Sequence, residues 1–116
     1  MTIQELGTIN QSQAAVKIVL LNNKYLGMVR QWQQLFFDQR YSETYLMNPD
    51  FIKVGEGFGI KGKKVLERPQ LAEAVKEMID SKGAYLLEVS IEKEDNVFPM
   101  VPTGASVSDV ILEPQK

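Results

Sequence analysis

The first part of the chain has two patterns of apolar residues: a helical spacing, followed by an unbroken apolar run. Ile3, Leu6 and Ile9 are three residues apart, which predicts a helix over residues 2–9. Residues 16–21, VKIVLL, form a β-branched and almost wholly apolar run. Such a run is typical of a strand that is covered on both faces of a parallel sheet. The chain is therefore expected to begin with a helix and a buried strand.

A second amphipathic helix is predicted shortly after this strand. Its apolar positions at helical spacing are Met28, Val29, Trp32, Leu35 and Phe36. The polar residues on the opposite side are Arg30, Gln31, Gln33 and Gln34. Stripes of this kind usually pack against the protein's own core or another subunit, and the alternative is an apolar wall over a cofactor. The helix is expected to end near Asp38.

Helices and strands alternate through the rest of the chain. Asn48 as N-cap, followed by Pro49 and Asp50, predicts the start of a short helix that stops by Gly59. The remaining predicted elements are a strand at 60–65, a helix from Pro69 to Gly83, a strand at 84–91 and a closing helix at 106–112. This order predicts an α/β fold, in which a parallel sheet has right-handed crossovers and helices on both faces.

Composition narrows the classes of function. The 116 residues, of 13.1 kDa, are enough for one domain or part of one, and a net charge of −2 with mixed signs argues against a nucleic-acid partner. The chain has no cysteine and no histidine, which excludes disulfides, Cys/His zinc sites and imidazole-based triads. Because it has neither a bilayer-length apolar run nor a signal-peptide pattern, we expect no membrane partner and a cytoplasmic location.

Two adjacent amides, Asn22 and Asn23, follow the first predicted strand. Ligands of open α/β sheets lie beyond the carboxyl ends of the strands, and an amide oxygen is a suitable ligand for Mg²⁺. The alternative is that two turn-forming residues simply end the strand. Gly27 likewise allows either a ligand close to the backbone or a positive φ. None of the scattered carboxylates is assigned a catalytic role; these are Glu5, Glu43, Glu56, Glu67 and Glu88.

Three segments together resemble a known enzyme family. They are NNKYLGMVRQWQQLFF (22–37), NPDFIKVGEGFGIKG (48–62) and VFPMVPTG (97–104). Over essentially its whole length the chain resembles the C-terminal part of the catalytic large subunit of acetohydroxyacid synthase, also called acetolactate synthase. The double Asn is shared by thiamine-diphosphate enzymes generally, whereas the tryptophan-bearing segment argues against a catabolic acetolactate synthase.

The resemblance implies the positions of a cofactor and metal site. Asn23 would give its amide oxygen and Tyr25 its backbone carbonyl to Mg²⁺. Leu26, Gly27 and Met28 would lie against thiamine diphosphate. The residues implied to line the substrate and inhibitor channel are Met28, Val29, Trp32, Thr103 and Gly104. The tryptophan is associated in this family with preference for 2-ketobutyrate as the second substrate.

The same resemblance implies that part of the site is missing. Met1 corresponds to a position just downstream of the Gly-Asp-Gly segment that supplies a metal-binding Asp in the family. Residues 1–116 are thus expected to be the C-terminal portion of a thiamine-diphosphate-binding domain, truncated at its N-terminus. The pyrimidine-binding domain and the FAD-binding domain would also be absent.

The activity implied for the intact parent is carboligation. Pyruvate is condensed with a second 2-ketoacid, pyruvate or 2-ketobutyrate, to acetolactate or acetohydroxybutyrate in branched-chain amino-acid biosynthesis. A homo-oligomer and a regulatory small subunit are the implied protein partners. We expect the chain alone to be inactive and to self-associate through an exposed sheet edge. A non-catalytic, self-associating α/β fragment is the alternative interpretation.

Overall fold

The computed structural model describes residues 2–113, which form two compact units. Unit 1 contains the residues up to Lys24 together with Leu46–Glu92. Unit 2 contains Tyr25–Tyr45 together with the residues from Lys93 onward.

Unit 1 is built on a parallel sheet. Its strands are β1 (Lys17–Asn22), β2 (Lys61–Val65) and β3 (Tyr85–Ser90), in the spatial order β1-β3-β2. Both neighbours of β3 run parallel to it, so the predicted α/β fold with a parallel sheet is confirmed. In register, Leu20 and Lys64 flank Glu88 on the central strand.

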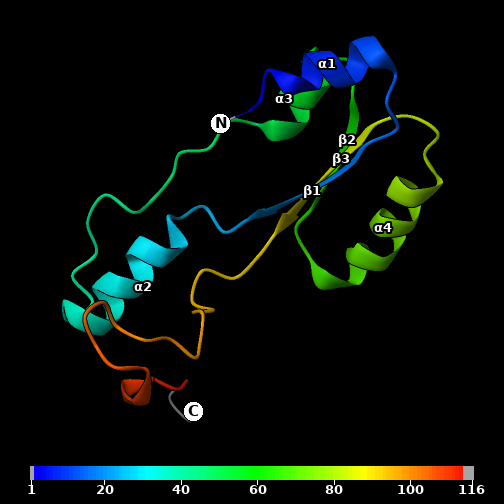
Figure 1. Cartoon of the computed structure of the whole chain (residues 1–116). Helices are drawn as coiled ribbons and strands as arrows, with labels where there is room; N and C mark the ends of the chain where they lie inside the picture. Colours follow the sequence, from blue (N-terminus) through cyan, green and yellow to red (C-terminus); the bar gives the residue numbers. More distant parts are fainter. Residues whose placement is uncertain (1, 114–116) are drawn as a thin grey trace. The chain divides into compact units, whose positions relative to one another are not determined.

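Helices lie on both faces of this sheet, as predicted. Figure 1 shows α1 (Glu5–Ser12) and α3 (Phe51–Gly57) on one face and α4 (Leu71–Asp80) on the other, with the 3-10 turn η1 (Arg68–Gln70) leading into α4. On the α3 face, Gly62 allows a close approach. A Cβ at this position would stand 2.7 Å from the Leu86 backbone oxygen and 3.1 Å from Ile52 of α3. A side chain there would therefore collide first with the backbone of the neighbouring strand β3.

The apolar core of unit 1 lies between the sheet and α4. Its buried members are Val65, Ala74, Met78, Tyr85 and Leu87. The helix predicted from Pro69 is confirmed as α4, which packs Leu71, Val75 and Met78 in or against this core, whereas Ile79 is 64% exposed. Residues 85 and 87 of β3 therefore face α4, and the alternate residues 86 and 88 face α3.

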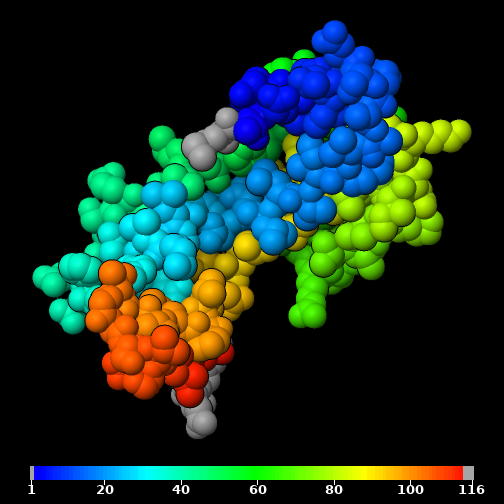
Figure 2. All heavy atoms as spheres, viewed as in Figure 1, coloured from blue at the N-terminus to red at the C-terminus, as the bar shows by residue number. Residues whose placement is uncertain are grey.

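The prediction that the first strand is covered on both faces is wrong for this chain. Val19 is 51% exposed and Leu21 is 62% exposed. The atoms of β1 lie at the visible surface of unit 1 in Figure 2. The physical reason is that the core beneath α4 is made by β2 and β3 and includes no buried residue of β1.

Several predicted helix boundaries are also wrong. The first helix begins at Glu5 rather than residue 2, and its N-cap makes no side-chain hydrogen bond. Asp50, not Asn48, caps α3 and accepts hydrogen bonds from the Ile52 and Lys53 backbone amides. The helix begins at Phe51, so Asp50 rather than Asn48 is the residue next to its first turn.

The C-terminal boundaries differ from the predictions as well. The fourth helix ends at Asp80, before Gly83, because Ser81 is already extended. The predicted closing helix at 106–112 is only a 3-10 turn, η2 (Val107–Asp109), capped by Ser106. The residues after it pair instead in an isolated antiparallel bridge between Met100 and Ile111.

Unit 2 consists of α2 (Gly27–Phe36), the residues on either side of it, and the segment from Lys93 onward. A short antiparallel bridge joins Tyr25 to Tyr45, and the Leu26 backbone amide donates to the Thr44 oxygen at 2.9 Å. These contacts join the two ends of the segment that contains α2.

Candidate functional site

The strand β1 ends in a turn built by Asn22. Its side-chain Oδ1 accepts a hydrogen bond from the Lys24 backbone amide at 2.9 Å, and Lys24 has a left-handed φ of 61°. The same oxygen accepts from the Asn48 side-chain amide at 2.9 Å. Asn22 is only 8% exposed. The prediction that Asn22 finishes the strand is therefore confirmed, with an Asx-type turn as the mechanism.

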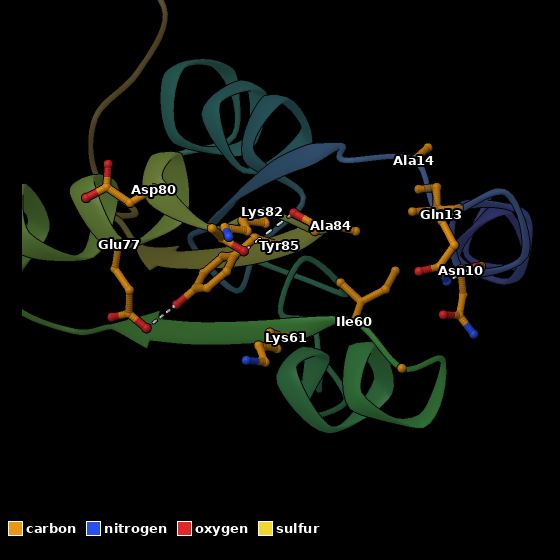
Figure 3. A pocket seen from close by; sticks show the side chains of 14 residues that line it. Asn10, Gln13, Ala14, Ile60, Lys61, Glu77, Asp80, Lys82, Ala84 and Tyr85 are labelled. Atoms are coloured by element: carbon orange, nitrogen blue, oxygen red, sulfur yellow. Dashed lines mark hydrogen bonds between the residues drawn. The ribbon is translucent and has the colours of Figure 1, made fainter.

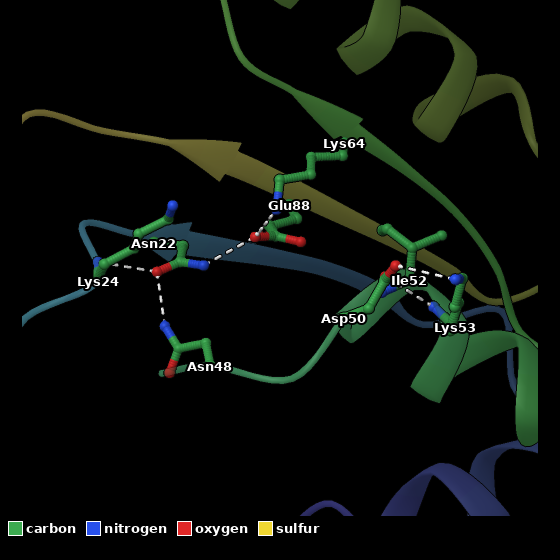
Figure 4. Close-up of polar contacts among 8 residues, drawn as sticks. All are labelled: Asn22, Lys24, Asn48, Asp50, Ile52, Lys53, Lys64 and Glu88. Atoms are coloured by element: carbon green, nitrogen blue, oxygen red, sulfur yellow. Dashed lines mark hydrogen bonds and ion pairs between the residues drawn. The ribbon is translucent and has the colours of Figure 1, made fainter. Parts of the chain in front are cut away.

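A buried carboxylate lies directly behind this turn. The Asn22 side chain donates through Nδ2 to Glu88 Oε1 at 2.7 Å, and Lys64 forms an ion pair with the same oxygen at 2.8 Å (Figure 4). Glu88 is 1% exposed, and its other oxygen, Oε2, has no hydrogen-bond partner within residues 2–113. Glu88 has no predicted role from the sequence. The available signal was a charged residue inside the apolar run YLLEV.

Asn23 immediately follows this strand and lies at the carboxyl ends of the parallel strands, half-buried. Its amide oxygen is a hard neutral donor of the kind that Mg²⁺ accepts beside substrate phosphates. Within the described part of the chain, no group of three or more acidic, histidine or cysteine side chains could hold a metal ion. The donors present thus fit a site in which protein oxygens are few and other groups complete the coordination.

The other implied cofactor residues belong to unit 2. The Tyr25 ring packs edge-on against Tyr45, with ring centroids 5.5 Å apart. The resemblance implies a metal-binding role for its backbone carbonyl and not for this ring. Leu26 is 44% exposed and Met28 is 57% exposed. Gly27 is the first residue of α2, where helical backbone has a negative φ, so the need for a positive φ does not explain this glycine.

The implied channel residues also all belong to unit 2, and most are exposed. On α2, Val29 is 48% exposed, and half-buried Trp32 packs against Phe36 with ring centroids 4.8 Å apart. Thr103 and Gly104 are exposed, and Gly104 has a φ of 84° in a turn. This helix therefore leaves part of its apolar stripe uncovered.

The polar side of α2 is the buried side. Arg30 is 6% exposed and Gln31 is 2% exposed, the reverse of the usual amphipathic pattern. Arg30 binds both carboxylate oxygens of Glu94, at 2.9 and 3.1 Å, and Gln31 exchanges two hydrogen bonds with the Val97 backbone, each at 2.9 Å. The segment that follows Lys93 covers this side, which the helical periodicity alone could not indicate.

Arg30 is also held by aromatic rings. Its guanidinium carbon lies 4.1 Å from the centroid of the Tyr41 ring and 5.2 Å from that of Tyr25. Stacking of this kind favours Arg over Lys because the guanidinium is planar and weakly hydrated. The paired carboxylate and the two rings together compensate a charge that is removed from water.

A separate cavity of about 670 Å³ opens at the amino ends of β2 and β3 (Figure 3). Its lining includes Asn10, Ile60, Lys61, Glu77 and Tyr85, and none of the implied cofactor or channel residues. The Tyr85 hydroxyl donates to Glu77 at 2.9 Å. Burial, and then the hydrogen bond to the Glu77 carboxylate, raise the pKa of Tyr85 to about 12.

The raised pKa predicts that the Tyr85 hydroxyl loses its proton at a higher pH than an ordinary tyrosine does. A group whose pKa is raised by folding stabilises the folded state at pH values below its unfolded pKa, and this contribution is lost as pH rises through the folded pKa. Stability should therefore fall between about pH 10 and 12. Absorbance of tyrosinate should show a component near pH 12 that disappears in Tyr85→Phe. If the variant keeps this component, the assignment to Tyr85 is wrong.

Comparisons with known proteins agree with this fold. Residues 1–89 match the family model described as thiamine pyrophosphate enzyme, C-terminal TPP binding domain. A 4-hydroxybenzoylformate decarboxylase from Rhodococcus jostii RHA1, described as thiamine diphosphate-dependent, superposes with a TM-score of 0.69. That alignment has 24% identity and covers 78% of this chain and 17% of the decarboxylase. None of the helices described here has the length and apolar character required to cross a bilayer.

Similarity in sequence extends over nearly the whole chain. The large subunit of acetolactate synthase isozyme 2 from Escherichia coli K12 is 53% identical over 112 residues, which are 96% of this chain and 20% of that protein. The mitochondrial acetolactate synthase catalytic subunit of Saccharomyces cerevisiae is 45% identical over 111 residues, 96% of this chain and 16% of that protein. The chain thus spans a fifth or less of these relatives. By its match over residues 1–89, the chain belongs to the thiamine pyrophosphate enzyme family, in the C-terminal cofactor-binding domain.

Proposed function

We propose that this chain is the C-terminal portion of the thiamine-diphosphate-binding domain of an acetohydroxyacid synthase. The complete enzyme would condense pyruvate with pyruvate or 2-ketobutyrate to acetolactate or acetohydroxybutyrate. The observation that carries the proposal is the 53% identity with an acetolactate synthase large subunit across 96% of the chain. A homo-oligomer, a regulatory subunit, FAD in another domain and a cytoplasmic location belong to the same proposal.

In this proposal the residues after β1 anchor the cofactor through Mg²⁺. The Asn23 amide oxygen and the Tyr25 backbone carbonyl would bind the metal, and Leu26, Gly27 and Met28 would contact thiamine diphosphate. Bound thiamine diphosphate would supply the electron-sink chemistry of the reaction. The support from the molecule is the position of Asn23, which directly follows β1 at the carboxyl ends of the parallel strands and is half-buried.

The exposed part of α2 would contact the second 2-ketoacid. Met28 and Val29 are 57% and 48% exposed although they are apolar. Such side chains could exclude water beside a bound acceptor, and Trp32, with Thr103 and Gly104, would limit its size. This would make the uncovered apolar stripe a channel wall rather than a packing surface.

The activity can be tested with a composite enzyme, in which this chain replaces the segment that it matches in the Escherichia coli large subunit. Trp32→Leu in the composite enzyme should lower the ratio of acetohydroxybutyrate to acetolactate by about tenfold when both acceptors compete, because differential contacts with one methylene change specificity by about 10–200-fold. The two products are quantified together by mass spectrometry.

Phe36→Leu is the matched control, because Phe36 packs against Trp32 and is not an implied channel residue. It should leave the product ratio close to that of the unmodified composite enzyme. An unchanged ratio in Trp32→Leu would show that the proposed channel assignment is wrong.

A second candidate function is a non-catalytic, self-associating module. It is favoured by the exposed Val19 and Leu21 on a strand that has only one partner in the described sheet. Unpaired strand edges and apolar surface favour association with another chain.

Self-association has a direct test. The chain should sediment as a dimer or larger species, and Leu21→Lys should shift it toward the monomer, because the charge lies at the exposed strand. Val107→Lys is the control, since Val107 is 84% exposed but lies outside the sheet. A wild-type chain that remains monomeric at high micromolar concentration would exclude this candidate.

A further inference from the structure

We propose that Glu88 is a positioning residue that acts through Asn22 to orient the turn that carries Asn23. The inference rests on the proposed role of Asn23 as a ligand of Mg²⁺. Glu88 is the central member of a chain of polar contacts on the α3 face of unit 1, between Lys64 and Asn22 (Figure 4).

Glu88 is a costly residue for stability alone. Its carboxylate is 1% exposed, its ion-pair partner Lys64 has a side chain 42% exposed, and Oε2 has no hydrogen-bond partner within residues 2–113. A buried ion pair often stabilises a fold no better than apolar residues of similar volume. The neighbour of Glu88 on the same face of β3 is Leu86, which is apolar and 6% exposed, so a purely structural site would be expected to hold an apolar residue here too.

What the carboxylate contributes is a defined orientation of the Asn22 amide. An asparagine amide has a donor end and an acceptor end, and these can exchange places by rotation. An ionised carboxylate only accepts hydrogen bonds, so Glu88 Oε1 requires the Nδ2 end of Asn22, at 2.7 Å. The Oδ1 end must then point away from Glu88.

The orientation of Asn22 determines the turn that follows. Its Oδ1 accepts from the Lys24 backbone amide and from the Asn48 side chain, each at 2.9 Å. With the amide reversed, the Lys24 backbone amide would face another donor, and the Asn48 side-chain amide would have to reverse as well. The Asn22 backbone oxygen also accepts from the Ile91 amide at 3.1 Å, so both the main chain and the side chain are fixed.

Asn23 is the central residue of this turn, between Asn22 and Lys24. The left-handed Lys24, φ 61°, and the hydrogen bond from the Leu46 amide to the Lys24 oxygen, 2.8 Å, hold its far side. Groups that orient a metal ligand from behind commonly change metal affinity by 10–100-fold when they are removed. Glu88 would therefore influence Mg²⁺ binding without contacting the metal.

The test compares Glu88→Leu with Glu88→Gln in the composite enzyme. Both variants remove one negative charge, but only Gln keeps an oxygen that can accept from Asn22 Nδ2. Glu88→Leu should raise the Kd for Mg²⁺, titrated calorimetrically at saturating thiamine diphosphate, by about tenfold or more. Glu88→Gln should keep this Kd within about threefold of that of the unmodified protein.

Glu77 provides the matched control. Its carboxylate also accepts from a buried donor, Tyr85, and pairs with a lysine, Lys63, but it lies on the other face of the sheet. Glu77→Leu and Glu77→Gln should therefore give the same Mg²⁺ affinity, whatever they do to the melting temperature. If Glu88→Leu does not fold, Asn22→Ala carries the same expectation, because it removes the link and keeps the Glu88–Lys64 pair.

The outcomes separate this inference from the proposed function. Equal Kd values in Glu88→Leu and Glu88→Gln, or wild-type affinity in Asn22→Ala, would overturn the positioning role. If Asn23→Ala itself binds Mg²⁺ normally, the metal assignment fails first. Hydrogen exchange of the Lys24 backbone amide, measured without bound metal or cofactor, then gives an independent result. Relative to exchange of the Leu87 amide, it should be faster in Glu88→Leu and unchanged in Glu88→Gln. Equal exchange of the Lys24 amide in the two variants would overturn the positioning role.

Discussion

Asn23→Ala is expected to weaken Mg²⁺ binding by the composite enzyme on the order of 100-fold, since it removes a proposed ligand rather than a group behind one. Mg²⁺ is small and demands near-octahedral oxygen ligands, so a lost oxygen is poorly replaced by a distant side chain. The measurement is a calorimetric Mg²⁺ titration at saturating thiamine diphosphate. Asn23→Asp should retain binding because it keeps an oxygen at the same position.

Asn10→Ala is the control for this prediction. Asn10 is an asparagine of unit 1 that lines the cavity at the opposite ends of the strands. It should bind Mg²⁺ as the unmodified composite enzyme does. Unchanged affinity in Asn23→Ala, with the protein folded, would remove Asn23 from the metal site and with it the main proposed role of the β1 terminus.

Glu94→Ala is expected to destabilise unit 2 by about 2 kcal/mol. It leaves the guanidinium of Arg30, whose side chain is 7% exposed, without its carboxylate partner. Breaking a fully buried pair costs about 3–5 kcal/mol, and we expect less here because the Glu94 side chain is 48% exposed. Urea denaturation measures the loss, and limited proteolysis should cleave the segment after Lys93 faster than in the unmodified chain.

Asp38→Asn provides the comparison within the same unit, because Asn, like Asp, tolerates the left-handed φ of 51° at this position. It also breaks an arginine–carboxylate pair, with Arg40 at 3.6 Å, but these side chains are 91% and 74% exposed. Exposed pairs contribute about 0–1 kcal/mol, so this variant should unfold almost as the unmodified chain does. If the two substitutions lower the free energy of unfolding equally, burial of Arg30 does not increase the contribution of its ion pair to stability.

The sequence pattern predicted the arrangement of unit 1 well because its signals are local. The run VKIVLL and the spacing of Leu71, Val75 and Met78 identify a strand and a helix without reference to the rest of the chain. The parallel sheet then follows from the alternation of elements. Exact boundaries did not follow, because Asn48 and Asp50 are both favourable N-cap residues and the sequence does not distinguish them, whereas in the structure Asp50 caps α3.

The candidate site was only partly predictable because its contacts join residues that are distant in sequence. The double Asn could be recognised at the end of a strand, but the Asn22 side chain is held by Glu88, from a strand 66 residues away in sequence. The α2 pattern was misleading because Arg30 and Gln31 are buried by Glu94 and Val97, again distant in sequence. Periodicity indicates which residues share a face, and it does not indicate which face is covered.

The proposed function is tested most directly by product formation in the composite enzyme. Supplied with pyruvate, Mg²⁺ and thiamine diphosphate, it should form acetolactate, and product should be lost when either the metal or the cofactor is omitted. The 116-residue chain alone should form none. A composite enzyme that folds and binds thiamine diphosphate but makes no acetolactate would contradict the assignment of this chain to an acetohydroxyacid synthase.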